Sequence, residues 1–507
     1  MGTDAPEFFR VDDENALSGR TVVYDEFGIR YVLVTPPWKL DDPQGENRLL
    51  PLAEGGQGAT YLTENPDVIL KFANYDNNFI TDPELIENYR RRIRYISTLP
   101  LPPESNITIP QTFLKGYAGY RMVFLDGFCS LNDFFYKKDA AQDEERPDYI
   151  PAGPSGARLR KYLATGALAH RLEVLGKASV ILARLHARGI SYGDISLNNI
   201  FLPINGSESE AWFIDPDNMV EAGHPVWSQC IGTDPYCAPE ICEGGCCDLT
   251  SDTFSFAELA FNLLADRHPF HGKAYDTSDL LRQEKSNPRN FAWICDPEDE
   301  SNRSALFLPV QKLFPRELMR LFWQTFVAGK DDPSARSPMA LWPVELFRGL
   351  DMLTHCPHCG LSFIAGEDDA ACPICRTALE DELLFTVHPA ASDRVLWQVR
   401  RHIAHDGTTS ASVPRRAVAP FEFGDYDSKV LCCVLADGCL TLQKVPMDNC
   451  RVIFHYADGH SQELRTERLQ LTPDELQSGQ LSSEITKFGI TVSRRIVCRI
   501  IRRRNRQ

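Results

Sequence analysis

The sequence lacks any apolar run of about 18 residues, so no membrane-spanning helix is expected. Its N-terminus is acidic and has no apolar core of the kind that a secretory signal peptide needs. Pro6 stands where an N-myristoylation signal requires Ser or Thr. We therefore expect a cytoplasmic protein with no membrane partner.

Positive charge is also scarce. The chain has 53 Lys and Arg against 70 Asp and Glu, a net charge of −17, which argues against general binding to nucleic acids or membrane surfaces. The exception is the stretch 494–507, which holds seven arginines and no acid. These arginines alternate in part with Ile496, Cys498 and Ile500, so the stretch is either a solvated strand or a site for an anionic partner.

The 16 cysteines are not expected to form disulfides, because a cytosolic chain of 507 residues keeps its thiols reduced. Four of them form two Cys-x-x-Cys pairs with twelve residues between the pairs: Cys356, Cys359, Cys372 and Cys375. Four thiolates at this spacing suit tetrahedral Zn²⁺ in a closed, structural site. We predict a zinc ribbon over 350–380; the alternative is a pair of redox-active or free dithiols.

The stretch 190–202 predicts a rigid turn between two short apolar strands, with Asp194 in the turn and Asn199 five residues later. A carboxylate can accept a proton from a hydroxyl, and an amide oxygen can ligate a hard cation such as Mg²⁺. Asp215 ends an apolar strand about twenty residues further on and is placed to hold a metal.

Two features nearer the N-terminus are suited to phosphate. Gly55, Gly56 and Gly58 expose backbone N–H groups, although an ordinary hairpin turn explains them equally well. An apolar strand then ends in Lys71, which needs an anion. Asp82 and the proline after it start a helix, from which Glu87, or failing that Glu84, is expected to reach Lys71.

The most specific string is Gly232-Thr-Asp-Pro-Tyr-Cys-Ala-Pro-Glu240. It matches, at every fixed position, the G-T-x-x-Y-x-A-P-E segment that closes the activation loop of protein kinases. Asp252 stands where these kinases anchor the catalytic loop, and Arg336 where an arginine pairs with the glutamate of A-P-E. Over residues 46–345 the chain thus resembles the eukaryotic-like protein kinase superfamily, which implies a bilobal α+β fold.

The resemblance also implies roles for the residues already named. Asp194 would be the catalytic base, and Lys71, paired with Glu87, would bind the phosphates of ATP under the Gly-rich loop. Asn199 and Asp215 would hold Mg²⁺. The substrate would be a Ser or Thr hydroxyl of a partner protein, since Thr233 is typical of Ser/Thr kinases.

Three departures qualify these roles. Tyr192 and Gly193 replace the His-Arg that precedes the catalytic Asp, Ser196 replaces a common lysine, and Pro216-Asp217 replaces Phe-Gly. The pattern is similar to a divergent bacterial group whose members are encoded beside a von Willebrand A-type protein and a protein phosphatase, which suggests both as partners. The alternative function is a pseudokinase scaffold that binds nucleotide and proteins without phosphotransfer.

The rest of the chain is assigned from its pattern. Residues 1–45 predict an N-terminal β extension with two short strands, and 161–188 predict one long helix. Residues 381–507 predict an all-β interaction domain with hairpin signals at Asp437-Gly438 and Asp458-Gly459. A third functional hypothesis is a ribbon protein that binds nucleic acid through the arginine-rich stretch, which would make binding sensitive to salt.

Overall fold

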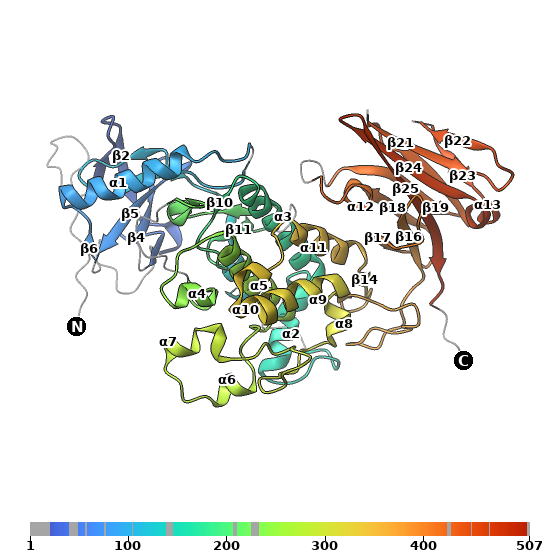
Figure 1. Cartoon of the computed structure of the whole chain (residues 1–507), viewed down its shortest axis with the longest axis horizontal. Coiled ribbons are helices and arrows are strands. Elements are labelled where there is room, and N and C mark those ends of the chain that lie inside the picture. The colour runs from blue at the N-terminus through green and yellow to red at the C-terminus, as the bar shows by residue number, and fades with distance from the viewer. Residues whose placement is uncertain are drawn as a thin grey trace.

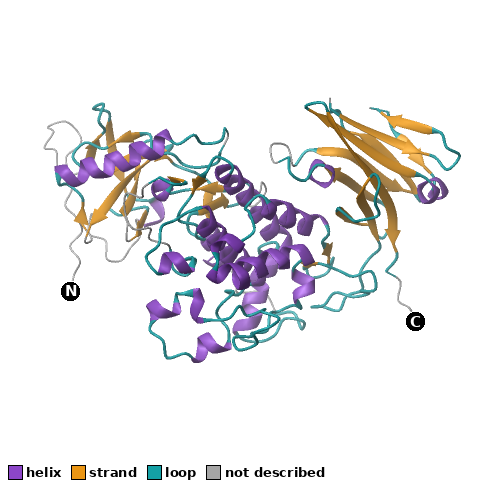
Figure 2. Cartoon of the chain, viewed as in Figure 1, coloured by secondary structure: helices purple, strands orange, loops and turns teal. Residues whose placement is uncertain are grey.

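The computed structural model describes residues 21–39, 49–55, 58–75, 78–103, 105–137, 146–205, 210–224, 233–422, 427–447, 449–465 and 467–503. Three parts follow one another along the long axis: a blue sheet with one helix, a green to yellow helical part, and an orange to red β-rich part (Figure 1). Figure 2 shows the same succession as strand, helix and strand, so the chain mixes α and β structure.

The N-terminal sheet has the strand order β1-β2-β4-β5-β8-β7, and β3 and β6 pair at its margins. Its strands are β1 (Val22–Tyr24), β2 (Arg30–Val34), β3 (Ala53–Gly55), β4 (Gly58–Thr63), β5 (Val68–Tyr75), β6 (Asn78–Phe79), β7 (Thr112–Phe113) and β8 (Gly119–Val123). The two strands expected in the N-terminal extension are β1 and β2, and they belong to this same sheet because β2 pairs with β4.

Helix α1 (Pro83–Thr98) starts as its sequence predicts. The Asp82 carboxylate accepts hydrogen bonds from the backbone N–H groups of Glu84 and Leu85, and Pro83 occupies the first turn. Ile93 and Ile96 are buried against residues of the sheet. One face of α1 therefore packs on the sheet while its acidic start lies at the surface.

The helical part is built around α3 and α5, whose side chains are largely buried. Its helices are α2 (Pro154–Ala164), α3 (Ala167–His186), α4 (Pro239–Cys242), α5 (Leu249–Ala265), α6 (Lys273–Thr277), α7 (Arg282–Lys285), α8 (Val310–Leu313), α9 (Arg316–Trp323), α10 (Gly329–Asp331) and α11 (Leu341–Asp351). The single helix predicted over 161–188 is wrong: Gly166 has φ +86°, a left-handed conformation that ends α2 and lets α3 begin in a new direction.

Short strands beside α3 position the loops of the candidate site. They are β9 (Phe128–Ser130), β10 (Ile190–Ser191), β11 (Ile200–Pro203), β12 (Trp212–Phe213) and β13 (Val220–Glu221). Strand β11 lies between β9 and β12, and β10 pairs with β13. These ladders bring the stretch after β10 next to the stretch after β12, although about twenty residues separate them in the sequence.

The β-rich part has two sheets, with the orders β17-β16-β25-β24-β21-β22 and β18-β19-β20-β23. The strands are β16 (Glu382–Pro389), β17 (Trp397–His402), β18 (Thr409–Pro414), β19 (Lys429–Ala436), β20 (Cys439–Lys444), β21 (Cys450–His455), β22 (Ser461–Leu464), β23 (Leu469–Leu471), β24 (Gln480–Lys487) and β25 (Ile490–Ile501). Two short helices, α12 (Arg415–Val418) and α13 (Pro473–Ser478), interrupt them. Asp437 and Gly438, both with positive φ, turn β19 into β20 as a hairpin.

The β-rich part is packed against the helical part. Val180 of α3 and Phe347 of α11 lie in the same buried cluster as the strands β16 and β17. The buried carboxylate of Asp351 accepts hydrogen bonds from Trp397 Nε1 at 2.9 Å and from Arg416 Nε at 2.9 Å. The two parts therefore share an apolar core and a charged contact.

Among the described residues, no helix combines the length and the apolar character that crossing a membrane requires.

Candidate active site and cysteine cluster

Asp252 of α5 holds the loop that carries Asp194. The Asp252 carboxylate accepts hydrogen bonds from the backbone N–H of Tyr192 at 2.6 Å and of Gly193 at 2.8 Å. His186 Nε2 lies 3.1 Å from the same carboxylate. Asp252 is 2% exposed, so α5 holds the loop through buried hydrogen bonds, as expected for the anchor residue.

Asp194 is buried and already hydrogen-bonded on both carboxylate oxygens. The Thr233 hydroxyl donates to Oδ1, and Asn199 Nδ2 donates to Oδ2 at 3.0 Å. Burial raises the pKa of the Asp194 carboxyl to about 6; the hydrogen bond from Thr233 opposes this shift, and the charge of Asp215 adds to it. A carboxylate with a pKa near neutrality that accepts a hydrogen bond from a hydroxyl has the properties of a general base.

Asn199 and Asp215 come together at the ends of paired strands. Residues 200 and 213 face each other in the β11–β12 ladder, and the N–H of Ile214 donates to the carbonyl oxygen of Asn199 at 3.0 Å. Asp215 follows directly. Carboxylate and amide oxygens form a hard donor set, so the chemistry of these two residues fits Mg²⁺.

Lys71 of β5 points at Asp215 and Asp217. Its ammonium group pairs with the Asp215 carboxylate, and it lies 2.8 Å from Asp217 Oδ2. Burial alone would lower the pKa of Lys71, but the charges of Asp215 and Asp217 raise it above the usual value of a lysine, so the side chain stays charged. Burial raises the pKa of the Asp215 carboxyl, and Lys71 acts against that shift.

Asp217 is the functional candidate that the sequence prediction missed. It is 6% exposed, and besides Lys71 it accepts hydrogen bonds from the Tyr120 hydroxyl at 2.7 Å and the Tyr89 hydroxyl at 3.3 Å. Burial raises the pKa of both phenols, so they remain protonated donors. The signal in the sequence was a second acid two residues after Asp215, directly following Pro216.

Helix α1 contacts this segment through Tyr89 and Arg92. Arg92 Nε donates to the Asp217 carbonyl oxygen at 2.9 Å, and Arg92 Nη2 donates to Asn218 Oδ1 at 2.5 Å. Both acceptors belong to a short 3₁₀ turn, η3 (Pro216–Asn218). The helix is therefore joined to the segment after Asp215 by an arginine and a tyrosine.

The expected pair of Lys71 with a glutamate of α1 is not formed. Glu87 is exposed and pairs instead with Arg94 Nη1 at 3.1 Å on the same helix. Glu84, the second choice, lies in the exposed first turn. Both glutamates lie on the solvent side of α1, whereas Tyr89 and Arg92 face the segment around Asp217.

The departures at Tyr192 and Gly193 have a shared geometric reason. Gly193 has φ +81°, and a Cβ atom there would lie 2.6 Å from the backbone oxygen of Asn218, so only glycine fits. The Tyr192 hydroxyl donates to the backbone oxygen of Ile214, just before Asp215. Ser196 is buried. Tyr192 and Gly193 thus contact the residues just before Asp215 and in η3.

The Gly-rich stretch forms the β3–β4 hairpin, in which Gly55 faces Gly58. A Cβ atom on Gly58 would lie 2.2 Å from the Phe72 backbone oxygen of β5, whereas around Gly55 the space is open. Gly58 therefore allows close packing of the hairpin on the strand that carries Lys71. Gly56 lies outside the described residues.

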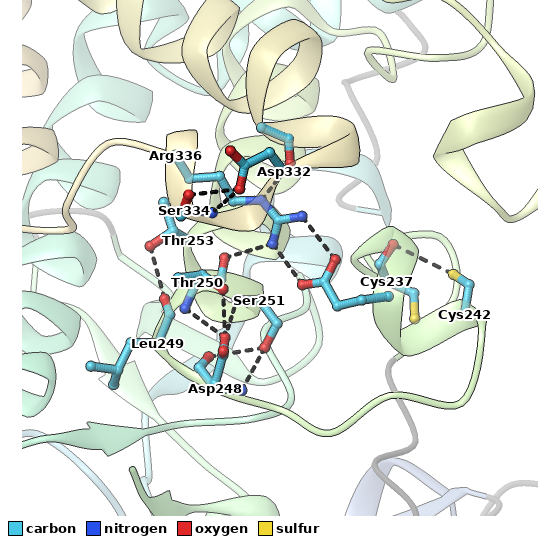
Figure 3. A network of polar contacts seen from close by, with 12 residues as sticks. Cys237, Cys242, Asp248, Leu249, Thr250, Ser251, Thr253, Asp332, Ser334 and Arg336 are labelled. Carbon is cyan, nitrogen blue, oxygen red and sulfur yellow. Dashed lines mark hydrogen bonds and ion pairs between the residues drawn. The ribbon is translucent and has the colours of Figure 1, made fainter. Parts of the chain in front are cut away.

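The end of the kinase-like string is tied down by Arg336. Its guanidinium lies 2.6 Å and 2.8 Å from the two carboxylate oxygens of Glu240, and Nη1 donates to the Thr250 carbonyl oxygen at 3.0 Å. Figure 3 shows Arg336 pointing at the start of α5, where the Asp248 side chain caps the helix. The predicted pairing of Arg336 with Glu240 is confirmed. Gly232, the first residue of the string, lies outside the described residues.

The four cysteines of the two Cys-x-x-Cys pairs form one cluster. Their Sγ atoms all lie within 4.8 Å of one another, with Cys356 and Cys375 3.4 Å apart and Cys359 and Cys372 3.7 Å apart. Ligands at about 2.3 Å from a tetrahedral zinc ion lie about 3.8 Å from each other, so these four thiols fit such an ion. The strands β14 (Thr354–His355) and β15 (Ser362–Phe363) hold the first pair.

The arginine-rich C-terminal stretch makes internal contacts in its described part. Arg495 pairs with Asp393, Arg499 with Glu367, Arg502 with Asp381 and Arg503 with Glu382. Arg503 Nη1 also donates to the Asp369 carbonyl oxygen at 3.0 Å, within the cysteine-containing segment. These charges are therefore partly neutralised within the chain, which weakens the nucleic-acid hypothesis.

No protein-family model matches the chain. It is 29% identical over 194 residues to the serine/threonine-protein kinase Nek5 of Homo sapiens, which covers 38% of this chain and 24% of that protein. It is 25% identical over 279 residues to the serine/threonine-protein kinase pkn2 of Myxococcus xanthus, covering 53% of this chain and 27% of the relative. The kinase Pkn1 of the same organism is 25% identical over 249 residues, covering 47% and 31%.

The chain thus spans between 24% and 31% of the length of these three relatives. All three are serine/threonine protein kinases by name, and they come from a bacterium and an animal. The chain is therefore similar to protein kinases of the serine/threonine type.

Proposed function

We propose that the chain is a protein kinase that transfers the γ-phosphate of ATP to Ser or Thr hydroxyls of a partner protein. The observation that carries the proposal is the environment of Asp194: a buried carboxylate with a pKa of about 6 that accepts a hydrogen bond from the hydroxyl of Thr233. In this proposal a substrate hydroxyl takes the place of the Thr233 hydroxyl and gives its proton to Asp194.

The other roles follow from the groups around Asp194. Lys71 would contact the nucleotide phosphates, and Gly55, Gly56 and Gly58 would bring backbone N–H groups over them. Asn199 and Asp215 would hold Mg²⁺, which when bound supplies positive charge to the transferring phosphoryl group. The hard oxygen donors of Asn199 and Asp215 and the adjacent Lys71–Asp215 pair support this assignment.

We further propose that Asp217 positions Lys71, a role that the resemblance would assign to Glu87. Lys71 contacts Asp217 directly, and Tyr89, Tyr120 and the backbone contact of Arg92 fix Asp217 from three directions. The N-terminal sheet with α1 and the helical part would form the two lobes of a kinase domain over 46–345, and the turn η3 would join them through these contacts.

A pseudokinase scaffold that binds nucleotide and proteins without phosphotransfer is the second candidate, because Tyr192, Gly193 and Ser196 replace familiar kinase residues. Transfer of labelled γ-phosphate from Mg·ATP to a generic protein acceptor separates the two. We expect Asp194→Ala and Asp215→Ala to abolish transfer, while Asp458→Ala, on an exposed hairpin of the β-rich part, leaves it unchanged. If the chain binds nucleotide but shows no phosphate transfer that is lost in Asp194→Ala and Asp215→Ala, the scaffold is favoured.

We propose that the four clustered cysteines hold one structural Zn²⁺ in a ribbon over 350–380. The ribbon is packed on the helical part: the Ser362 hydroxyl accepts a hydrogen bond from the Ala169 N–H of α3 at 2.8 Å. We expect one zinc per chain by metal analysis, and Cys372→Ser to lose the zinc and lower the melting temperature, because ribbon stability depends on its metal. Cys246→Ser, an exposed thiol outside the cluster, is the matched control.

The β-rich part from 381 onwards would be an interaction domain. Its packing against α3 and α11 means that a partner bound there would be held at a fixed position relative to the kinase-like part. A protein substrate is the partner that the kinase relatives support. A von Willebrand A-type protein and a protein phosphatase stay predictions that rest on the resemblance alone.

A further inference from the structure

A cavity of about 470 Å³ opens in the helical part, between α2, α3 and the end of α5. Its volume lies within the range of about 300–1,000 Å³ that is usual for ligand pockets. Aromatic rings of Phe135, Tyr136 and Tyr162 form one wall. Neither Asp194 nor Lys71 lines it, so this cavity is distinct from the candidate active site.

The lining of the cavity is basic, in a chain whose net charge is −17. It contains four cationic side chains, Arg158, Lys161, Arg171 and Arg267, and two carboxylates, Asp266 and Asp276. Burial lowers the pKa of His268 and of His271, which also line it, so neither histidine adds charge at neutral pH. The cavity therefore carries an excess of positive charge.

Arg171 is the deepest of these cations. It is 2% exposed, and its guanidinium donates to the backbone oxygens of Tyr162 and Ala167, at 3.2 Å and 2.9 Å, and to the Thr165 hydroxyl at 3.0 Å. Within the described part of the chain it has no carboxylate partner, and its Nε makes no hydrogen bond. A buried guanidinium without an anion is costly, so an anion entering the cavity would find a favourable field.

Arg267, which directly follows the end of α5, is also incompletely paired. Its Nε is buried without a hydrogen-bond partner, and its Nη2 is 4.0 Å from Asp276. Arg158, by contrast, is matched by Asp266 at 2.8 Å. With Asp266 matched to Arg158 and Asp276 near Arg267, the excess positive charge of the cavity is supplied by Lys161 and Arg171.

The cavity adjoins the segment that contacts the candidate base. Pro235 lines it and lies two residues after Thr233, in a turn closed by the hydrogen bond from the Tyr236 N–H to the Thr233 carbonyl oxygen at 2.7 Å. His268 Nε2 is 3.3 Å from the Pro235 oxygen, and Asn262 Nδ2 donates to the Tyr236 hydroxyl at 2.8 Å. A polypeptide whose hydroxyl reached Asp194 would therefore pass close to the cavity.

We propose that this cavity binds an anionic side chain of the substrate polypeptide, located within a few residues of the hydroxyl that accepts the phosphate. This proposal rests on the proposed kinase function, because it concerns the protein substrate of that function. It adds the chemical class of the substrate: acidic or already phosphorylated segments. Tyr136, the half-buried ring of the lining, would pack against the carbon atoms of that segment, while Lys161 and Arg267 would face its charge.

The test uses the full chain and a set of labelled peptides that differ only at the residues flanking one serine: Glu, phosphoserine, Gln or Lys. Fluorescence anisotropy without ATP gives each Kd. We expect the Glu peptide to bind about fivefold or more tightly than the Gln peptide, and the Lys peptide to bind least well. A phosphoserine peptide that binds tighter than the Glu peptide would place phosphorylated segments first within the class.

Variants locate the effect in the cavity. Arg267→Gln and Lys161→Gln should each reduce the preference for Glu by at least about twofold, and Arg267→Glu should turn it toward Lys. Arg320→Gln is the matched control, because Arg320 is a half-exposed arginine on α9 with an acidic neighbour, Glu317. Melting temperatures show that each variant is folded.

Equal binding of all four peptides, or an equal loss in Arg320→Gln, would overturn the proposal. The two proposals fail separately. Tight binding of the Glu peptide without phosphate transfer would contradict the kinase function and leave the anion site standing. Transfer to the Glu, Gln and Lys peptides at equal rates would contradict the anion site and leave the kinase function standing.

Discussion

Two buried ion clusters lie on either side of the Asp194 loop, and only one of them is balanced in charge. Arg336 and Glu240 form a one-to-one pair, and Arg336 Nε donates besides to the Gly329 backbone oxygen at 2.8 Å. Lys71, in contrast, faces two carboxylates, Asp215 and Asp217. The first cluster is saturated, whereas in the second two carboxylates share one lysine.

This difference suits the Arg336–Glu240 cluster to holding segments together and the Lys71 cluster to binding a charged ligand. A closed pair with complete hydrogen bonds holds segments together and has no capacity left for a ligand. An excess carboxylate beside Lys71 attracts a cation, and the charge of Asp215 also helps to raise the pKa of Asp194. We therefore expect substitutions in the first cluster to affect mainly stability and substitutions in the second to affect mainly catalysis.

The largest effect is expected for Glu240→Gln. It leaves the Arg336 guanidinium, whose side chain is 1% exposed, without its anion, which should lower the free energy of unfolding by about 3 kcal/mol. Urea denaturation measures the loss. Glu317→Gln, which breaks an exposed pair with Arg320, should cost less than about 1 kcal/mol. Equal losses in the two variants would show that the Arg336 pair has no special structural role.

The next effect concerns the unbalanced cluster. Asp217→Asn keeps the shape of the side chain but removes the charge that holds Lys71, so we expect kcat to fall by about 10- to 100-fold. Glu87→Gln, on the exposed side of α1, should change kcat by less than about twofold. Steady-state kinetics with Mg·ATP and a protein acceptor measure both. A large loss in Glu87→Gln with a small one in Asp217→Asn would restore Glu87 as the partner of Lys71.

The same two clusters show what can be read from the sequence. The contacts of Arg336, Glu240 and Asp252 could be predicted because these residues lie in short strings that resemble those of protein kinases, and the cluster of the four cysteines could be predicted from their spacing. The partner of Lys71 could not, because it depends on the rotation of α1 about its axis. That rotation puts Glu87 in solvent and is set by Tyr89 and Arg92, which no motif singles out.

Other limits of the sequence-based prediction also have causes in particular residues. The predicted helix over 161–188 followed an apolar period that continues across Gly166, but a residue at φ +86° ends the helix whatever its neighbours are. The strand expected from the partial alternation of the arginine-rich stretch is observed as β25, Ile490–Ile501. The acidic partners of its arginines are 102 to 132 residues away, on segments whose approach only the fold determines.

The smallest effect, and the most specific one for Asp194, is a shift in pH dependence. Asp194 can act as a base only when deprotonated, so kcat/KM should rise with pH through about 6 and level off above it. The Thr233 hydroxyl donates to the charged carboxylate and therefore lowers its pKa. Thr233→Val removes this donor, so the rising limb should move upward by about one pH unit, the worth of one hydrogen bond to a charged group. A profile from pH 5 to 9 measures the shift, and Thr277→Val, an exposed threonine of α6, should leave the limb in place. An unmoved limb in Thr233→Val would mean that a group other than Asp194 controls the rate. The charge of Asp215 would then not act on the rate through the pKa of Asp194.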